Sequence, residues 1–321
     1  MPFDLTKGII AAPVTPFNTD ESIDWRTLES YMAQIAEAGP AGIALNMAAG
    51  EGGSLERDEQ LEVVKRTKAV VAGASAVVAG VLASATSQAV RKARDLAATG
   101  ADALVVFPVL PTFASKPISV SMVVDYHAAI AAAVDIPVIA FQTSLVAYPK
   151  GVVTELAKIK NIVAIKDAAF DIDTSEATIA EARATGGSIS VLTGNDTFIL
   201  EAMLMGSTGA LIGFAGTATA ELIRMQKLAA ERKITEAYEI WDRLGPLAKF
   251  CWGPPLRDYR VRMKYVLLRQ GVIPSDTARL PQPAISDADR KEIDRLFETY
   301  GYADARYLPA GAKGPRLRSV R

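Results

Sequence analysis

Short apolar runs rich in β-branched residues recur along the chain and alternate with segments of helical periodicity. Each run is apolar on both faces, as strands of a parallel sheet are when helices cover both sides. There are eight such runs, at residues 8–13, 42–45, 76–81, 103–107, 136–141, 162–166, 188–192 and 209–213. Between them, apolar residues recur three or four positions apart, as Leu28, Tyr31, Met32 and Ile35 do. The pattern predicts eight successive strand–helix units.

Repeated strand–helix units favour an α/β fold, the (β/α)8 TIM barrel, over a sandwich. No Asn-Gly or Asp-Gly pair, which would mark a hairpin between strands, occurs in the chain. An open doubly wound sheet is the structural alternative. Against it, the first run is not followed by the Gly-x-Gly-x-x-Gly loop of a dinucleotide-binding fold.

After the eighth run the alternation ends, and the rest of the chain predicts helices only. The helical segments are 218–232, 234–250, 256–270 and 288–300, and Ser286 with Asp289 forms a capping signal before the last of them. We therefore predict a barrel at residues 1–220 and a C-terminal helical appendage of the same domain at 221–307. A frayed tail follows at 308–321.

The composition of the chain limits the partners and the kinds of site that it can have. The 321 residues are 50% hydrophobic, and 35 Lys+Arg against 36 Asp+Glu leave a formal charge of -1. This balance argues against nucleic acid or an anionic membrane as the main partner. A single cysteine, Cys251, and a single histidine, His127, exclude disulfides within the chain and zinc sites built from several Cys or His ligands.

The chain also lacks the signs of export or membrane insertion. Asp4 and Lys7 interrupt any apolar segment at the N-terminus, so the sequence predicts a cytoplasmic protein. Residues 69–90 and 202–220 are uncharged and long enough to raise the question of a membrane span. Both contain Gly, Ser and Thr and are interpreted as a helix end, a turn and a buried strand.

Lys166 is the strongest candidate for a catalytic residue, because active sites of TIM barrels lie at the carboxyl ends of the strands. It ends the run 162–165, and period-two alternation places it on the side of Ala164 and Ile162, directed into the barrel mouth. Among apolar walls a lysine loses hydration, its pKa falls, and the neutral amine becomes a nucleophile toward a carbonyl. The alternative is a lysine on the rim with its head in water.

Other strand ends are compatible with a site for a 2-oxo acid. Backbone N–H groups of Ala48, Ala49 and Gly50 could hold a carboxylate as a nest, although most glycine-rich turns are only turns. After strand seven, Asn195 and Asp196 precede a helix, where an N-cap role is the simpler interpretation.

Two positions have mainly structural interpretations. Gly213 follows strand eight, where many barrels bind phosphate, but no lysine or arginine stands beside it in sequence. His127 lies in the middle of a helix and is interpreted as a packing or surface residue rather than as part of a catalytic pair.

Several motifs, in order, resemble those of the dihydrodipicolinate synthase / N-acetylneuraminate lyase family of class I aldolases over nearly the whole chain. The motifs are Ala12-Pro13-Val14-Thr15-Pro16-Phe17, Ala48-Ala49-Gly50-Glu51, Ala164-Ile165-Lys166-Asp167, Thr193-Gly194-Asn195-Asp196 and Gly271-Val272-Ile273-Pro274. The resemblance implies that Lys166 forms a Schiff base with a 2-oxo acid. It also implies no cofactor, and a homo-oligomer, either a dimer or a tetramer. The predicted substrate-binding residues are Ala48, Ala49, Gly50, Thr143, Gly194, Asn195 and Gly213.

Departures from the family pattern concern its proton relay. The family's tyrosine at the end of strand five is Phe141 here, which forms only a pocket wall, and its threonine pair is Ala48-Ala49. Residues 108–113 also lack the tyrosine that a neighbouring subunit supplies in many synthases. Proton transfer is then left to water, to Thr143 or Gln142, or to a substrate carboxyl.

The leading hypothesis is a Schiff-base lyase, an aldolase or dehydratase, acting on pyruvate or a pyruvate-derived aldol. The apolar replacements favour a bulkier or less polar substrate than sugar acids. The alternatives are a catalytically impaired barrel that binds a 2-oxo acid, and a 4-hydroxy-tetrahydrodipicolinate synthase with an altered relay. A metal-dependent aldolase is disfavoured by the single histidine, and pyridoxal phosphate by the lack of a phosphate cradle.

Overall fold

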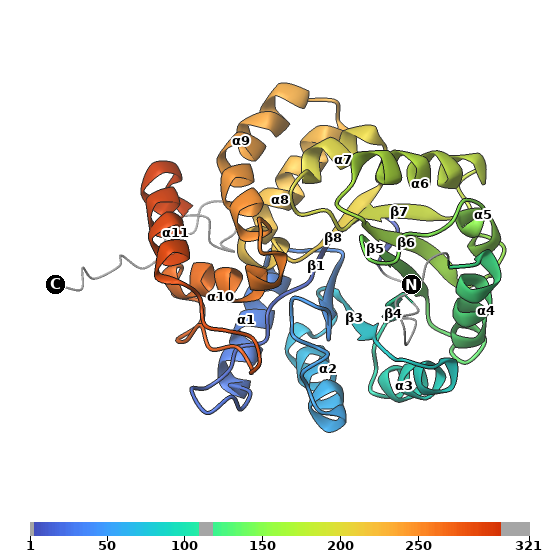
Figure 1. Ribbon diagram of the computed structural model, residues 1–321, viewed down its shortest axis with the longest axis horizontal. Helices are drawn as coiled ribbons and strands as arrows, with labels where there is room; N and C mark the ends of the chain where they lie inside the picture. The colour runs from blue at the N-terminus through green and yellow to red at the C-terminus, as the bar shows by residue number, and fades with distance from the viewer. Residues whose placement is uncertain (1–2, 109–117, 303–321) are drawn as a thin grey trace.

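In the computed structural model, residues 3–108 and 118–302 are described, and their eight parallel strands close into a barrel (Figure 1). Each strand pairs with the next in sequence, and β1 pairs with β8. The strands are β1 (Gly8–Ala11), β2 (Gly42–Leu45), β3 (Ala76–Val81), β4 (Ala103–Val106), β5 (Val138–Thr143), β6 (Ile162–Ala168), β7 (Ser190–Thr193) and β8 (Gly209–Ile212). The predicted TIM barrel is confirmed, with a strand in each of the eight apolar runs.

One helix follows each strand and covers the outside of the barrel (Figure 1). These helices are α1 (Trp25–Glu37), α2 (Arg57–Val71), α3 (Thr86–Ala98), α4 (Val120–Ala131), α5 (Val152–Leu156), α6 (Ile172–Ala184), α7 (Ile199–Met205) and α8 (Ala215–Ala230). The barrel's last helix therefore runs past residue 220, the boundary expected from the sequence. The two long uncharged stretches are divided among helices and the strands β3 and β8, as expected. No helix within residues 3–108 and 118–302 is both long and apolar enough to cross a membrane.

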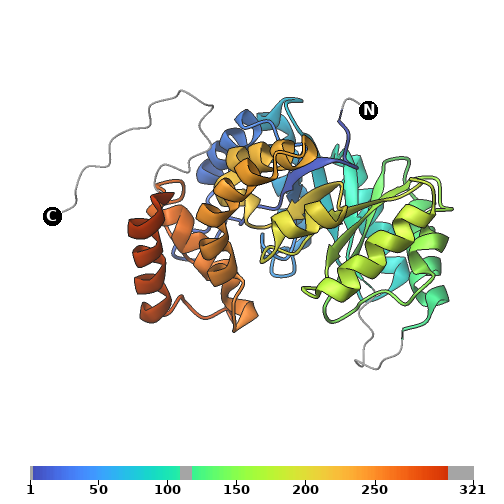
Figure 2. The same cartoon turned by 90° about the horizontal axis from the view of Figure 1, so that it is seen from above.

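The C-terminal appendage consists of helices that gather on one side of the barrel (Figure 2). They are α9 (Ile234–Cys251), the short 3-10 turn η1 (Leu256–Asp258), α10 (Tyr259–Arg269) and α11 (Asp287–Tyr300). The Ser286 side chain caps α11 by accepting a hydrogen bond from the Asp289 N–H, as the sequence signal predicts. The expected tail at 308–321 lies outside the described residues.

Two apolar clusters divide the core into an outer and an inner layer. The outer one fills the space between strands and helices, and the inner one fills the barrel itself. Two inner residues at the mouth are small, Ala12 and Ala168. Small side chains at this level leave room for a cavity above the packed interior.

The alternation along β6 is broken once, which corrects the expected side of Ile162. Ala164 belongs to the inner layer, but Ile162 packs in the outer one. The pairing with β5 shifts between Val138 and Ile139, so that β6 advances by one extra residue there. Beyond this irregularity the period of two resumes and carries Lys166 to the barrel mouth.

Candidate active site

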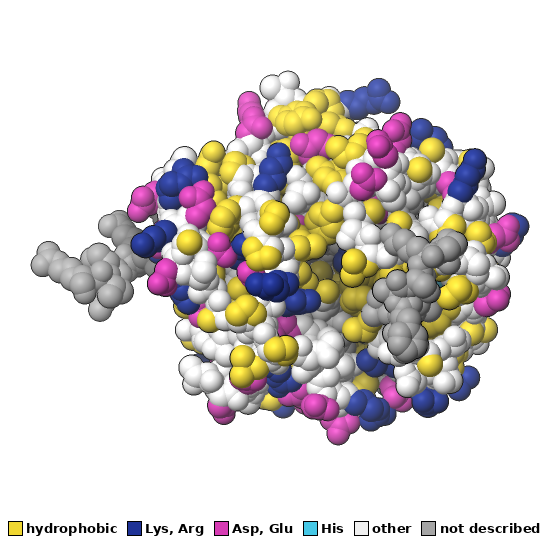
Figure 3. Space-filling view, in the orientation of Figure 1, with side chains coloured by type: hydrophobic (Ala, Val, Ile, Leu, Met, Phe, Trp, Pro, Cys, Tyr) yellow, Lys and Arg dark blue, Asp and Glu magenta, His cyan; other side chains and the backbone are white. Residues whose placement is uncertain are grey.

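A cavity of about 420 Å³ opens at the carboxyl ends of the strands. Its walls are mostly apolar. On the face shown in Figure 3, hydrophobic side chains gather near the middle, and charged side chains of both signs are spread over the rest. Of the predicted site residues, those that line it are Ala48, Ala49, Phe141, Thr143, Lys166, Gly194 and Gly213. Gly50 and Asn195 are not among the lining residues. The segment 108–113, which lacks the family's tyrosine, lies outside the described residues except for Pro108.

Lys166 stands in this cavity with only 8% of its surface exposed. Its Nζ lies 4.3 Å from the centre of the Phe141 ring and makes no hydrogen bond or ion pair with any described residue. Burial lowers the pKa of Lys166 to about 8, and the negative charge of Asp196 opposes that shift. Burial therefore shifts the amine toward its neutral form.

The neighbouring residue in β6, Asp167, points away from the cavity and ties three strand ends together. One carboxylate oxygen of Asp167 accepts a hydrogen bond from the Gln142 amide at 2.8 Å, and the other accepts from Asn195 at 3.2 Å and from the Ser175 hydroxyl. Gln142 also donates to the Thr178 hydroxyl. Gln142 and Asn195 thus hold the framework of β5, β6 and β7. This placement removes Gln142 from the candidates for proton transfer.

Gly194 provides the space through which the Lys166 side chain passes. A Cβ at position 194 would lie 2.7 Å from Lys166 Cε and 2.9 Å from Ala168 Cβ. Real Cβ atoms are not found at such distances, so any side chain at 194 displaces the lysine.

We expect Gly194→Ala to lower kcat/KM by about 10²-fold, because a displacement of about 1 Å at a reacting group costs that much. The rate of covalent trapping of a 2-oxo acid on Lys166 measures the effect directly. Gly73→Ala is a control, since a Cβ there has no neighbour within 4 Å, although its positive φ carries a small cost of its own. An unchanged trapping rate in Gly194→Ala would contradict the packing argument.

Asp196 is a second buried ionisable group in the cavity, 3% exposed. Its carboxylate accepts a hydrogen bond from the Phe214 N–H at 2.7 Å. Burial raises the pKa of Asp196 to about 7, while the Phe214 N–H and the Lys166 charge oppose that rise. The N-cap interpretation is wrong, because α7 begins only at Ile199 and Phe198 occupies its N-cap. The signal in the sequence was a carboxylate three residues after one strand, beside a strand with a lysine near its end.

The turn after β2 lies at the cavity and contains unused backbone donors. The N–H groups of Ala48, Ala49 and Gly50 donate no hydrogen bond to any described residue. Ala48 and Ala49 line the cavity, whereas Gly50 packs under the Pro13 carbonyl, 3.1 Å from where its Cβ would lie. Free N–H groups facing a cavity are suited to bind a carboxylate.

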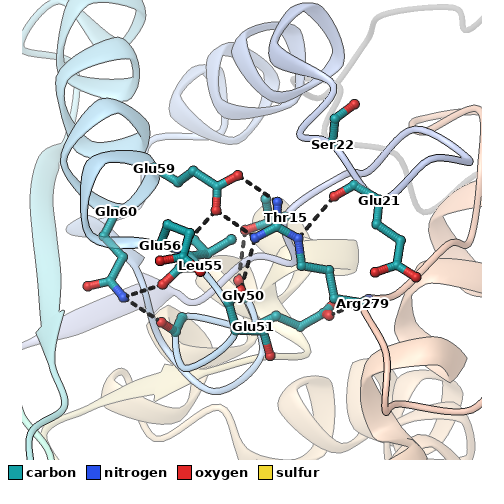
Figure 4. A network of polar contacts seen from close by, with 12 residues as sticks. Thr15, Glu21, Ser22, Gly50, Glu51, Leu55, Glu56, Glu59, Gln60 and Arg279 are labelled. Atoms are coloured by element: carbon teal, nitrogen blue, oxygen red, sulfur yellow. Dashed lines mark hydrogen bonds and ion pairs between the residues drawn. The ribbon is translucent and has the colours of Figure 1, made fainter.

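Arg279, from the segment before α11, clamps this turn from behind (Figure 4). Its guanidinium donates two hydrogen bonds of 2.6 Å to the Glu59 carboxylate in α2, and others to the carbonyls of Ser54 and Glu21. The Arg279 N–H also donates to Glu51, whose carboxylate forms a buried ion pair of 2.5 Å with Lys264 in α10. The appendage therefore fixes the position of the turn.

We expect Arg279→Met to lower the free energy of unfolding by about 2–3 kcal/mol, because it leaves hydrogen-bond acceptors unpaired in a half-buried network. For a chain of this size the loss corresponds to a Tm roughly 3–5 °C lower. The matched control is Arg57→Met, which breaks ion pairs of an arginine that is 63% exposed and should shift Tm little. Equal shifts in the two variants would argue against the clamp.

The C-terminal appendage forms one wall of the cavity, which the sequence did not predict. Trp252, Leu256, Arg257, Tyr259 and Arg260 all line the cavity. The Trp252 ring stacks on Tyr259 with 5.2 Å between ring centres, and Arg260 Nε donates to the Ala48 carbonyl at 2.7 Å. A Cβ on Gly213 would lie 2.6 Å from the Trp252 ring, so the glycine after β8 admits this aromatic wall.

Of the packing and surface roles that the sequence left open for His127, the structure shows packing. It is fully buried in α4, and burial lowers its pKa to about 4, so the ring is neutral. Nδ1 lies 2.7 Å from the Val123 carbonyl, and Nε2 lies 3.2 Å from the Tyr148 hydroxyl, which donates to the Phe141 carbonyl. These contacts brace β5 from outside the cavity. Within the described ranges no three Cys, His, Asp or Glu side chains are grouped to hold a metal ion.

Comparison with known proteins decides the family. The sequence model of the Dihydrodipicolinate synthetase family matches residues 5–299. The chain belongs to this family. It is 31% identical to the 4-hydroxy-tetrahydrodipicolinate synthase of Thioalkalivibrio sulfidiphilus over 284 residues, covering 87% of this chain and 92% of the relative. The corresponding enzyme of Laribacter hongkongensis is 30% identical over 299 residues, covering 92% and 98%.

Solved structures agree with this membership of the dihydrodipicolinate synthetase family. A chloride-inhibited dihydrodipicolinate synthase of Acinetobacter baumannii, described as complexed with pyruvate, superposes with a TM-score of 0.81 at 25% identity, covering 92% of this chain and 99% of the other. The enzyme of Thermotoga maritima, at 22% identity, shares the fold with a TM-score of 0.84 and the same coverage. The predicted enzyme class is confirmed, a lyase of the class I aldolase type.

Proposed function

We propose that this member of the dihydrodipicolinate synthetase family cleaves or forms an aldol of a 2-oxo acid such as pyruvate, with Lys166 as the nucleophile. The observation that carries the proposal is a buried lysine amine without a hydrogen-bond partner among the described residues, set in an apolar cavity at the barrel mouth. Desolvation lowers its pKa, which is what a lysine nucleophile requires. The names of the relatives, and the pyruvate bound to one of them, support the same substrate class.

The reaction begins with attack of the neutral Lys166 Nζ on the C2 carbonyl of the 2-oxo acid. A C–N bond forms, the carbonyl oxygen takes up protons and leaves as water, and a cationic imine results. The imine withdraws electrons from C2, so a proton is lost from C3 and an enamine forms. In the synthetic direction the enamine carbon attacks an aldehyde, and in the reverse direction the same C–C bond breaks.

The carboxylate of the 2-oxo acid is held by the turn after β2. Ala48 and Ala49 line the cavity, and their N–H groups, which donate to no described residue, need no side-chain hydroxyl to bind an anion. This arrangement fits a sequence with two alanines in place of the family's threonine pair. Arg279 and the ion pair between Glu51 and Lys264 keep those donors in place.

Asp196 is the group that we assign to proton transfer. The Phe141 ring has no ionisable group, and Gln142 is held outside the cavity. Asp196 lines the cavity and interacts electrostatically with Lys166. Its pKa of about 7 allows it to accept a proton and return it near neutral pH. The Thr143 hydroxyl is the remaining uncharged candidate on β5.

Borohydride reduction in the presence of pyruvate tests the proposal. A stable secondary amine, detected as a mass increment, should form on the peptide that contains Lys166. Lys264 is a built-in control, because it is also buried with a pKa lowered to about 8 but is paired with Glu51 and lies outside the cavity. No increment on Lys166 with a panel of 2-oxo acids, or an increment on Lys264 instead, would overturn the proposal.

Two expectations from the sequence stay predictions. Assembly into a homodimer or homotetramer is tested by light scattering coupled to gel filtration. A cytoplasmic location is tested by fractionation of the native host.

A further inference from the structure

Aromatic side chains line the cavity beyond Lys166 from several directions. Phe107 follows β4, Phe141 lies on β5 and Phe170 follows β6. Trp252 and Tyr259 close the opposite side from the appendage. These five rings come from segments far apart in the sequence, and the barrel mouth brings them together.

Four of the five rings form two pairs with defined geometry. Phe107 meets Phe141 edge to face, with 5.0 Å between ring centres and 65° between planes. Trp252 and Tyr259 are stacked, at 5.2 Å and 19°. A flat stacked pair and an edge-to-face pair present the surfaces on which a planar apolar group packs best.

Apolar side chains also stand exposed at the rim of the same cavity. Leu145, in the segment after β5, is 76% exposed, and Leu256, in η1, is 43% exposed. Exposed large apolar residues that gather around one pocket indicate a ligand that covers them. Burial of this surface by an apolar ligand is favourable by roughly 25 cal/mol per Å².

Hydrogen-bonding groups are few by comparison. Arg257 is paired with Asp258, and Arg260 uses Nε on the Ala48 carbonyl. If Asp196 and Lys166 serve the reaction, the side-chain groups that remain for a substrate among the described lining residues are the Thr143, Ser144 and Tyr259 hydroxyls and the outer N–H groups of the two arginines. A polyhydroxylated chain would lose more hydrogen bonds to water than this cavity returns, at about 1–3 kcal/mol for each unpaired group.

We infer that the aldehyde half of the aldol carries an aryl group, an inference that rests on the proposed function. In the synthetic direction the enamine C3 attacks the aryl aldehyde carbon and a C–C bond forms. The aldehyde oxygen takes up one proton to become a hydroxyl, and water then hydrolyses the imine. The product is a 4-aryl-4-hydroxy-2-oxobutanoate, and cleavage runs the same steps in reverse. A cavity of about 420 Å³ has room for a 2-oxo acid and a ring together.

The experiment compares acceptors under conditions in which pyruvate trapping on Lys166 has been verified. Benzaldehyde, glyceraldehyde and succinic semialdehyde are each offered with pyruvate, and the aldol is quantified by mass spectrometry. We expect kcat/KM for benzaldehyde to exceed that for glyceraldehyde by at least about 10-fold. A preference for either of the two non-aromatic aldehydes, with trapping intact, overturns the inference and leaves the Schiff base standing. Absence of trapping overturns the proposed function itself.

Variants of the wall provide the second readout. Trp252→Ala should lower kcat/KM for benzaldehyde by at least about 10-fold more than it lowers the rate of pyruvate trapping, which is measured in the same variant. Leu256→Asp makes the same test on an exposed side chain whose replacement does not threaten folding. The control is Trp25→Ala, on α1 against Arg66 and away from the cavity. An unchanged benzaldehyde rate in both Trp252→Ala and Leu256→Asp contradicts the inference.

Discussion

Replacement of Lys166 by methionine is expected to lower kcat/KM by about 10⁴-fold or more, since no other described group in the cavity can form the imine. Methionine keeps the length and the apolar stem, so the walls around Phe141 stay packed. The readouts are aldol formation with pyruvate and the disappearance of the borohydride-dependent mass increment.

The same variant should be more stable than the parent. The lowered pKa of Lys166 means that the fold disfavours its protonated form, so at pH 7 the unfolded chain binds that proton more readily. Removal of the buried amine should therefore raise the free energy of unfolding by roughly 1–3 kcal/mol. Lys166→Arg is the matched variant, because it keeps a cation but offers no nucleophile, and it should lose activity without that gain. Retained trapping in Lys166→Met would exclude Lys166 as the nucleophile.

Replacement of Asp196 by asparagine is expected to lower kcat by about 10²–10⁴-fold, the usual contribution of a general acid–base group. Asparagine preserves the shape of the side chain and an oxygen that accepts the hydrogen bond from the Phe214 N–H. Only the charge and the exchangeable proton are lost.

The pH profile separates this role from a structural one. In the parent protein the trapping rate rises with pH through the pKa of Lys166 near 8, because only the neutral amine attacks. The charge of Asp196 raises that pKa, so in Asp196→Asn the rise should move to lower pH. Asp258→Asn, on a carboxylate that pairs with Arg257, is the control and should leave the profile in place. A profile of Asp196→Asn identical to the parent's would show that the two groups do not interact.

The barrel was predictable because its signal is local and repeated. Each strand coincides with an apolar run that is buried on both faces. The alternation of side chains near the end of β6 correctly predicted that Lys166 points inward. The side of Ile162 was not predictable, because the shift in pairing between Val138 and Ile139 depends on the neighbouring strand. The roles of Gln142 and Asn195 were hidden for a similar reason, since their partner is the Asp167 carboxylate on the outer side of β6.

The part of the site that the sequence did not predict is formed by residues far apart along the chain. Trp252 and Tyr259 lie far along the chain from Lys166, in a segment whose sequence predicts only helices, and the folded chain brings Trp252 against Gly213. Asp196 had a simpler local interpretation as a helix cap, and the start of α7 at Ile199 frees it for the cavity. Local patterns thus located the nucleophile but not the walls that give it an unusual pKa.

The clamp at Arg279 also gives the site an order of assembly during synthesis. A nascent chain that has emerged as far as β6 carries Lys166 but neither the Trp252 wall nor Arg279. Without that apolar cover the lysine stays hydrated and protonated at neutral pH. Burial of the amine is therefore complete only when the last part of the chain has docked on the barrel.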